Sequence, residues 1–164
     1  NYFNCQCKHP VNSSEGKKHQ YRGFGVGAAA LAFRPERTIW NGQAETMLGY
    51  NTKDEGRGIP RYCAERRLFD GAVTLGCKQI VGMVVVGPYQ PDDTSGYEGI
   101  TLHPCASCRK MMNEHKLSWP DMPIVTALPP PDDIDSWSPR EIDRWRPIYE
   151  WHSLKEILAI HRQV

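Results

Sequence analysis

Two short segments of the chain combine cysteine with residue types that support metal chemistry. The segment CAE covers residues 63–65, and PCASC covers residues 104–108. Cys105 and Cys108 are three positions apart, so on a helix their side chains share one face and can bind a single ion. Cys63 could supply a third sulfur, and three thiolates suit a tetrahedral Zn²⁺ site.

Other interpretations of these cysteines are open at this level. The chain has six of them, and the even number is compatible with disulfides: Cys5, Cys7, Cys63, Cys77, Cys105 and Cys108. A single C-x-x-C also occurs in structural zinc knuckles and redox dithiols, and one cysteine alone is often core packing. A chain of 164 residues buries enough surface to fold without disulfides. Metal or redox chemistry is therefore favoured, and Cys5, Cys7 and Cys77 are expected to be packing or surface thiols.

A carboxylate accompanies the first cysteine. Three protein ligands are typical of a catalytic zinc, because the fourth position is left for water. In the first turn of a helix, Cys63 and Glu65 can both lean into the cavity beyond the helix end, which places a carboxylate beside that water. The N-terminus of a helix also lowers the pKa of a thiol. A purely structural zinc site has no use for this carboxylate, which disfavours a non-catalytic zinc-stabilised binding protein.

The elements that would position these residues follow from hydrophobic spacing. Strands are expected at 26–33 and 37–45, joined as a hairpin, at 80–86 in the middle of the sheet, and at 123–128. Helices are expected at about 62–76 and from about 105, and two capping boxes, Ser138 to Glu141 and Ser153 to Glu156, predict two more. This alternation predicts an α/β fold, a three-layer α/β/α sandwich with a mixed central sheet.

Composition limits the class of protein. Residues 1–22 are polar, with a basic cluster at 17–22, and are expected to form an arm before a single domain at 23–164. The net charge is +1, so no general attraction to nucleic acid is indicated. The longest apolar run, residues 80–87, is too short to cross a membrane, and the N-terminal residues lack the apolar core of a signal peptide. A soluble, cytoplasmic protein is expected.

Four segments together resemble the zinc-dependent cytidine deaminase family, which includes blasticidin-S deaminase-like members. FGVGAAAL at 24–31 is similar to the family's F-x-V-G-A-A-L, and QAE at 43–45 to its N-x-E. CAER at 63–66 and PCASCR at 104–109 are similar to its C-A-E-R and P-C-x-x-C-R. The resemblance covers residues 21–128.

The resemblance implies a hydrolase that converts a cytosine nucleoside or analogue to its uracil form and releases ammonia. One Zn²⁺ per chain would be held by Cys63, Cys105 and Cys108. Glu65 would take a proton from the water that attacks C4 of the ring and pass it to N3 and then to the leaving ammonia. Arg66 would donate hydrogen bonds to a ligand sulfur and offset the negative charge of three thiolates.

The same resemblance implies the substrate contacts. Phe24 would flank the base, and Glu45 would bind the ribose 3′-hydroxyl together with Gln43, which stands where the family has asparagine. Ala64 and Pro104 are further positions at which the family binds substrate. The partners expected are a small-molecule nucleoside and further copies of the chain, as a dimer or tetramer of the kind that serves pyrimidine salvage.

Several features depart from the nucleoside branch. The connection into the helix at Cys63 is longer than usual, the loop 87–103 adds Tyr89 and Tyr97, and the C-terminal tail lacks the aromatic residue that many tetrameric members share with a neighbour. These departures resemble the breadth of the blasticidin deaminase-like branch. The alternative is a deaminase of cytosine in single-stranded DNA or RNA, including toxin-type enzymes, which would need a basic groove with stacking aromatic residues.

Overall fold

A computed structural model describes residues 25–35, 43–51, 62–88, 99–131 and 133–161 of the chain. The arm predicted at 1–22 lies outside the described residues, as do Phe24, Cys5, Cys7, Tyr89 and Tyr97.

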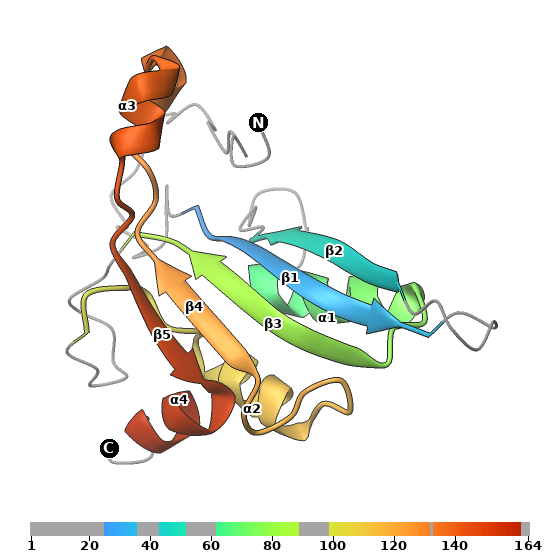
Figure 1. Cartoon of the computed structure of the whole chain (residues 1–164). Helices are drawn as coiled ribbons and strands as arrows, with labels where there is room; N and C mark the ends of the chain where they lie inside the picture. Colours follow the sequence, from blue (N-terminus) through green and yellow to red (C-terminus); the bar gives the residue numbers. More distant parts are fainter. Residues whose placement is uncertain (1–24, 36–42, 52–61, 89–98, 132, 162–164) are drawn as a thin grey trace, which may run out of the picture.

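The centre of the molecule is a mixed sheet of five strands (Figure 1), which are β1 (Gly27–Arg34), β2 (Gln43–Tyr50), β3 (Gln79–Val86), β4 (Pro123–Ala127) and β5 (Tyr149–Ser153). Their order across the sheet is β2-β1-β3-β4-β5. Strands β3 and β4 pair in parallel, and the other neighbours are antiparallel. The predicted α/β class, the mixed sheet and the central place of the 80–86 strand are confirmed.

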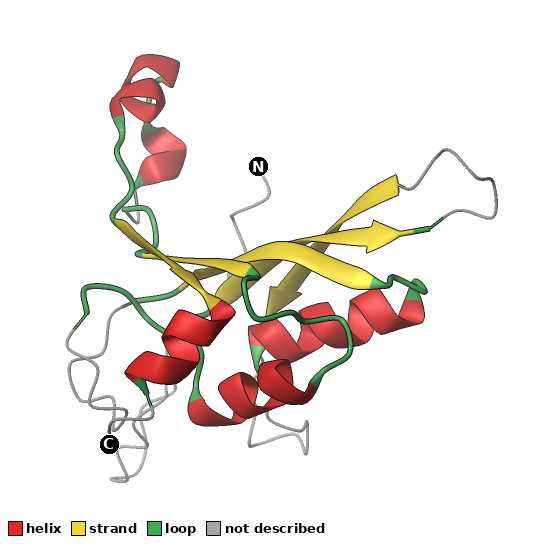
Figure 2. Cartoon of the chain, turned by 60° about the horizontal axis from the view of Figure 1, so that its bottom comes forward, coloured by secondary structure: helices red, strands yellow, loops and turns green. Residues whose placement is uncertain are grey.

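Three helices cover one face of this sheet. They are α1 (Ala64–Thr74), α2 (Ala106–Glu114) and α4 (Leu154–Ile160), and Figure 2 shows them together on the same side. The short α3 (Pro139–Arg144), preceded by a 3-10 turn at Ile134–Ser136, projects beyond one end of the sheet. In the part of the chain that the structure describes, no helix lies on the other face, so the second outer layer of the predicted sandwich is not among these residues.

The core lies between the sheet and these helices. Alternate residues of β1 point inward, and Ala28, Ala30 and Ala32 are all buried. Leu68 and Phe69 of α1 pack on this side and are almost fully buried, which stabilises the fold by about 1.5–3 kcal/mol each. Small side chains on the strand let the helix approach closely.

The closest approach of β2 and α1 occurs at Gly49. A Cβ added there would lie 2.3 Å from the carbonyl oxygen of Ala64, the first residue of α1. Only glycine fits without a shift of the strand or the helix. Gly49 therefore sets the position of the helix start.

The second strand was placed wrongly by sequence reasoning. It was expected at 37–45, but β2 runs from Gln43 to Tyr50 and pairs with β1 from Gly27–Tyr50 to Arg34–Gln43. Glycine and polar residues around position 49 are typical of a loop, but here the glycine is required inside the strand. The antiparallel hairpin itself is confirmed, whereas residues 36–42 lie outside the described part of the chain.

The C-terminal region contains one further difference. Both predicted capping boxes are present, with Ser138 and Ser153 each accepting a hydrogen bond from the backbone N–H three residues on. Strand β5, immediately before the second box, was not expected. This strand has only five residues, YEWHS, and most of them are polar. Its extended conformation therefore depends on pairing with β4 and not on an apolar pattern of its own.

The face of the sheet opposite the helices is apolar and exposed. We call it the open face and define it by large side chains that are 39–67% exposed: Leu31, Phe33, Leu48, Tyr50, Val81, Tyr149 and Trp151. The apolar run of β3 was expected to be covered on both sides, but Val81 is 41% exposed among the described residues. No helix among these residues is long and apolar enough to span a bilayer.

Candidate metal centre and proton-transfer site

The starts of α1 and α2 bring three cysteines together. Cys63 is the N-cap of α1, Cys105 is the N-cap of α2, and Cys108 lies in the first turn of α2. The sulfur atoms of Cys63 and Cys105 are 3.8 Å apart, and all three sulfurs lie within 4.8 Å of one another. Two segments separated by a whole strand therefore converge on one point.

These separations fit a zinc ion. Tetrahedral ligands with Zn–S bonds of 2.3 Å have sulfurs about 3.8 Å apart. A disulfide would require about 2.0 Å, and all four cysteines in the described ranges are free thiols. Disulfides among Cys63, Cys77, Cys105 and Cys108 are thus excluded, and Cys77 is a buried core residue, as expected.

The acidity of the thiols points to the same conclusion. Hydrogen bonds from Cys108 and Cys63 lower the pKa of Cys105. The hydrogen bond with Cys105 raises the pKa of Cys108, and the one with Cys105 also raises the pKa of Cys63 to about 11. Three thiols this close cannot all ionise unless a cation lies between them. The donor set therefore fits Zn²⁺, which binds thiolates.

Glu65 lies against this cluster. It occupies a core-facing position of α1, in line with the apolar stripe, and is only 4% exposed. Burial raises the pKa of the Glu65 carboxyl, an effect partly offset by hydrogen bonds from its own backbone N–H and from the Cys108 side chain. A buried carboxyl group whose pKa is raised in this way can accept a proton and release it to a neighbour.

Two of the solved structures that are similar to this chain are cytidine deaminases. A cytidine deaminase from Burkholderia pseudomallei is 22% identical, matches 84% of this chain and 80% of its own, and superposes with a TM-score of 0.52. A cytidine deaminase from Mycobacterium tuberculosis is 21% identical over 85% of this chain and 80% of its own, with a TM-score of 0.46. The fold is cytidine deaminase-like. By sequence, no family model and no curated protein matches the chain.

Within this cytidine deaminase-like fold, Arg66 lies in the first turn of α1. Its side chain is exposed, and its guanidinium carbon lies 6.0 Å from the centre of the Tyr62 ring. The hydrogen bond to a ligand sulfur that the resemblance implied is not among the contacts of the described residues. Arg109 instead donates a hydrogen bond of 2.7 Å to the carbonyl oxygen of Pro104, directly before Cys105. Arg109 therefore holds the loop that carries the second ligand.

The proposed substrate positions are divided between two places. Ala64 and Pro104 are buried next to Cys63 and Cys105 in the chain. Glu45 lies in β2 opposite Ala32, and its Oε1 is 3.4 Å from Nη2 of Arg34. It stands four residues before Gly49, which is about 13 Å along an extended strand. Glu45 therefore lies four residues along β2 from the point where this strand meets the start of α1. Gln43 begins the same strand, but its side chain lies outside the described part, as does Phe24.

Asn51 is a buried polar residue that sequence reasoning missed. Its Oδ1 accepts a hydrogen bond of 2.9 Å from the backbone N–H of Val26, and its own N–H donates to the Val26 carbonyl at 3.0 Å. These bonds fasten the end of β2 to the entry of β1, at the end of the hairpin where Gly49 meets Ala64. A lone asparagine after a strand gives no signal of such pairing.

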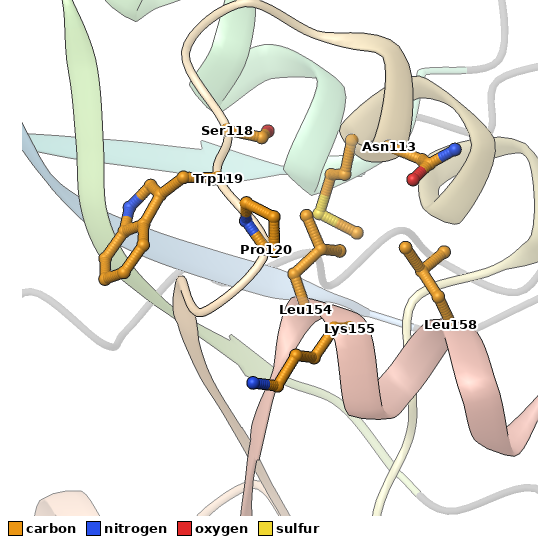
Figure 3. Close-up of a pocket in the computed structure, with 8 residues that line it drawn as sticks. Asn113, Ser118, Trp119, Pro120, Leu154, Lys155 and Leu158 are labelled. Atoms are coloured by element: carbon orange, nitrogen blue, oxygen red, sulfur yellow. The ribbon is translucent and has the colours of Figure 1, made fainter.

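A separate pocket of about 300 Å³ lies between α2, α4 and residues 118–120 (Figure 3). Trp119, Pro120, Leu154 and Leu158 line it together with the aliphatic part of Lys155. Neither Glu65 nor any of the three cysteines contributes to its wall. The pocket is therefore distinct from the candidate metal centre.

Proposed function

We propose that the chain is a zinc-dependent deaminase that hydrolyses a cytosine nucleoside or nucleoside analogue to the uracil form and releases ammonia. The observation that carries this proposal is the buried Glu65 carboxyl in contact with a cluster of three cysteine sulfurs. The cytidine deaminase-like fold, in which this cluster forms at the starts of two helices, supports it.

Cys63, Cys105 and Cys108 would hold the ion, and zinc bound there would act as a Lewis acid towards a water molecule. The three thiolates bring negative charge to the site. The N-termini of α1 and α2 both meet at the cluster, and their unpaired N–H groups offset part of that charge. The two helix N-termini therefore reduce the net negative charge of the metal centre, and the Glu65 carboxyl group lies beside it.

Glu65 would move the protons. As a carboxylate it would accept one proton from water, while the oxygen forms a bond to C4 of the cytosine ring. It would deliver this proton to N3, then take the second proton from the hydroxyl formed on C4 and pass it to the exocyclic nitrogen, so that the C4–N bond breaks and ammonia leaves. Water and a cytosine ring are consumed, and a uracil ring and ammonia are formed, which balances the reaction. Burial of Glu65 suits this task because it raises the carboxyl pKa and so makes the carboxylate a better proton acceptor.

A free nucleoside is the proposed substrate rather than nucleic acid. The net charge of +1 provides no strong attraction to a polyanion. Ala64 and Pro104 are the proposed substrate contacts beside the cysteines, with Phe24 across the base. Glu45 is held by Arg34, and a ribose contact would require this carboxylate to leave that partner.

The proposal includes a homo-oligomer, a dimer or tetramer, in the cytoplasm. The open face of the sheet supports association, because a patch of large apolar side chains is typical of protein interfaces. Light scattering of the purified protein measures the number of subunits.

The experiment is an ultraviolet absorbance assay with a parallel measurement of ammonia. Cytidine, deoxycytidine and blasticidin S are compared with single-stranded oligonucleotides that contain cytosine. Turnover of at least one free compound, with about one mole of ammonia per mole of substrate, supports the proposal. Turnover of oligonucleotides alone would establish the nucleic-acid alternative. Zinc-loaded protein that converts none of these substrates would refute the assignment.

A further inference from the structure

A second group of metal-ligating side chains lies outside the cysteine cluster. His103 stands before Pro104, Glu150 and His152 lie in β5, and His161 is the C-cap of α4. His103 is 3% exposed, and the other three are partly buried. Glu150 and His152 are paired with Thr126 and Ile124 of β4, two fully buried residues, so both side chains are on the helix-covered side of the sheet.

Three of these side chains are close enough to share an ion. One ligand atom from each of His103, Glu150 and His152 lies within 4.8 Å of the other two. The rings of His103 and His152 meet edge to face, with centres 5.0 Å apart. Two imidazoles and a carboxylate form a ligand set that zinc uses in known enzymes.

Hydrogen bonds orient two of the three ligands. Nδ1 of His103 is 3.2 Å from Nε2 of His161, which leaves Nε2 of His103 as the atom that points to a cation. Oε2 of Glu150 accepts bonds from the backbone N–H groups of Thr101 at 2.9 Å and Ile100 at 3.2 Å, and from the Thr101 hydroxyl. Support of this kind fixes the ring and carboxylate planes of metal ligands.

The third ligand provides an independent observation. Nε2 of His152 is buried and has no hydrogen-bond partner among the described residues. Buried ring nitrogens nearly always have a hydrogen-bond partner, because a buried nitrogen without one lowers the stability of the fold. A cation bonded to the lone pair of this nitrogen would satisfy it.

We propose that His103, Glu150 and His152 bind a divalent transition-metal cation, with Zn²⁺ as the expected ion and His161 as a positioning residue for His103. The site is distinct from the cysteine centre and does not depend on the proposed deaminase activity. The ion would tie β5 and the end of α4 to the segment that leads into Cys105. Nitrogen and oxygen donors suit Zn²⁺, Co²⁺ or Ni²⁺, whereas thiolates favour softer ions.

Zinc content and cobalt spectra test this site. Full-length protein is stripped with a chelator, loaded with Zn²⁺, dialysed and analysed for metal. We expect about two zinc ions per chain in the wild type and about one in Cys105→Ser and in His152→Gln. The double variant should hold almost none. With Co²⁺, Cys105→Ser should show ligand-field absorption without the thiolate charge-transfer band, and His152→Gln in that background should abolish it.

Two further variants separate a metal site from a hydrogen-bonded network. Glu150→Gln keeps an acceptor for Thr101 but weakens a ligand, and His161→Gln removes only the support of His103. Each should weaken zinc binding to the Cys105→Ser protein by about 10-fold or more in competition with a chromogenic chelator. His115→Gln, at a histidine outside the cluster, is the matched control and should leave zinc binding unchanged. Two outcomes would overturn the proposal, whether or not the cysteine centre binds zinc. The first is that Cys105→Ser binds no zinc, and the second is that it binds the same amount with and without the added His152→Gln change.

Discussion

The sulfur atoms of Cys63 and Cys105 lie 3.8 Å apart, although 42 positions separate the two residues in the chain. Both are the residues at which a helix begins, so their separation depends on where α1 and α2 start. The backbone around each helix start is held by specific contacts, Gly49 against Ala64 and Arg109 on the Pro104 carbonyl. Changes at the sulfurs, at the carboxyl group beside them or at these contacts should therefore have separable effects.

Glu65→Gln should remove the proton carrier and leave the metal in place. We expect kcat/KM for a cytosine nucleoside to fall by at least about 100-fold, because proton transfer by a positioned side chain contributes that much or more. Zinc content should stay unchanged, and stability should not fall, since a buried carboxyl group is replaced by a neutral one. Glu114→Gln, at an exposed carboxylate of α2, is the control. Full activity in Glu65→Gln would remove Glu65 from the reaction.

Cys105→Ser should release the zinc of the cysteine centre and lower the melting temperature, because metal binding is coupled to folding. Cys77→Ala is the matched control. This buried cysteine lies outside the cluster, so its loss should lower stability through packing alone and leave zinc content unchanged. Calorimetry and metal analysis of both variants make the comparison. Equal metal content in Cys105→Ser and wild type would contradict the ligand assignment.

Gly49→Ala should damage the site from a distance. The new methyl group would lie 2.3 Å from the Ala64 carbonyl oxygen, so the start of α1 must move. We expect a loss of about 1–3 kcal/mol in the free energy of unfolding, together with reduced activity. Gly27→Ala, in the neighbouring strand, has nothing within 4 Å and should change stability by less than about 0.5 kcal/mol. Denaturant titration distinguishes the two, and equal stabilities would show that the contact is not restrictive.

Ser153→Ala should destabilise the fold by about 1 kcal/mol, because it removes the N-cap of α4. This helix buries Leu154 and Ile157 in the core, so its fraying affects the whole domain. Ser138→Ala removes the same type of cap from α3, which buries no residue, and its effect on global unfolding should be smaller. The two melting temperatures decide, and an equal decrease in both would contradict this interpretation.

The second box should also give a pH dependence. Hydrogen bonds from the backbone N–H and hydroxyl of Ser153 lower the pKa of Glu156. A carboxylate whose pKa is lowered by folding stabilises the fold at pH values above its unfolded pKa, and this contribution is lost as the pH falls through its folded pKa. The stability difference between wild type and Glu156→Gln should therefore shrink from pH 7 to pH 3. A difference that grows on acidification would have the wrong sign.

Local signals were enough to predict the helix starts. Cys63 and Cys105 each precede an apolar stripe of helical spacing, and the boxes at Ser138 and Ser153 need only residues three positions apart. The convergence of the cysteines follows from placing both helices on the same side of the strand between them. These features depend on short-range geometry, which a sequence expresses directly.

Other features depend on partners that are distant in the chain. The boundaries of β2 follow from the packing of Gly49 on Ala64, and β5 exists because β4 offers it an edge. Similarly, His103 and His152 come together only when β5 has been placed. The resemblance of QAE to the family's N-x-E made Glu45 a substrate contact, a prediction that the ion pair with Arg34 does not test.

The open face should also govern how the protein behaves in solution. Among the described residues, the outward-facing positions of the five strands carry no charge around Leu31, Leu48 and Trp151. At one edge of the face, the guanidinium carbon of Arg67 lies 4.7 Å from the centre of the Tyr50 ring. Sulfate and other excluded salts strengthen contacts between apolar surfaces. Retention on a hydrophobic chromatography resin, and precipitation at rising ammonium sulfate, should thus decrease when Trp151 is replaced by a lysine.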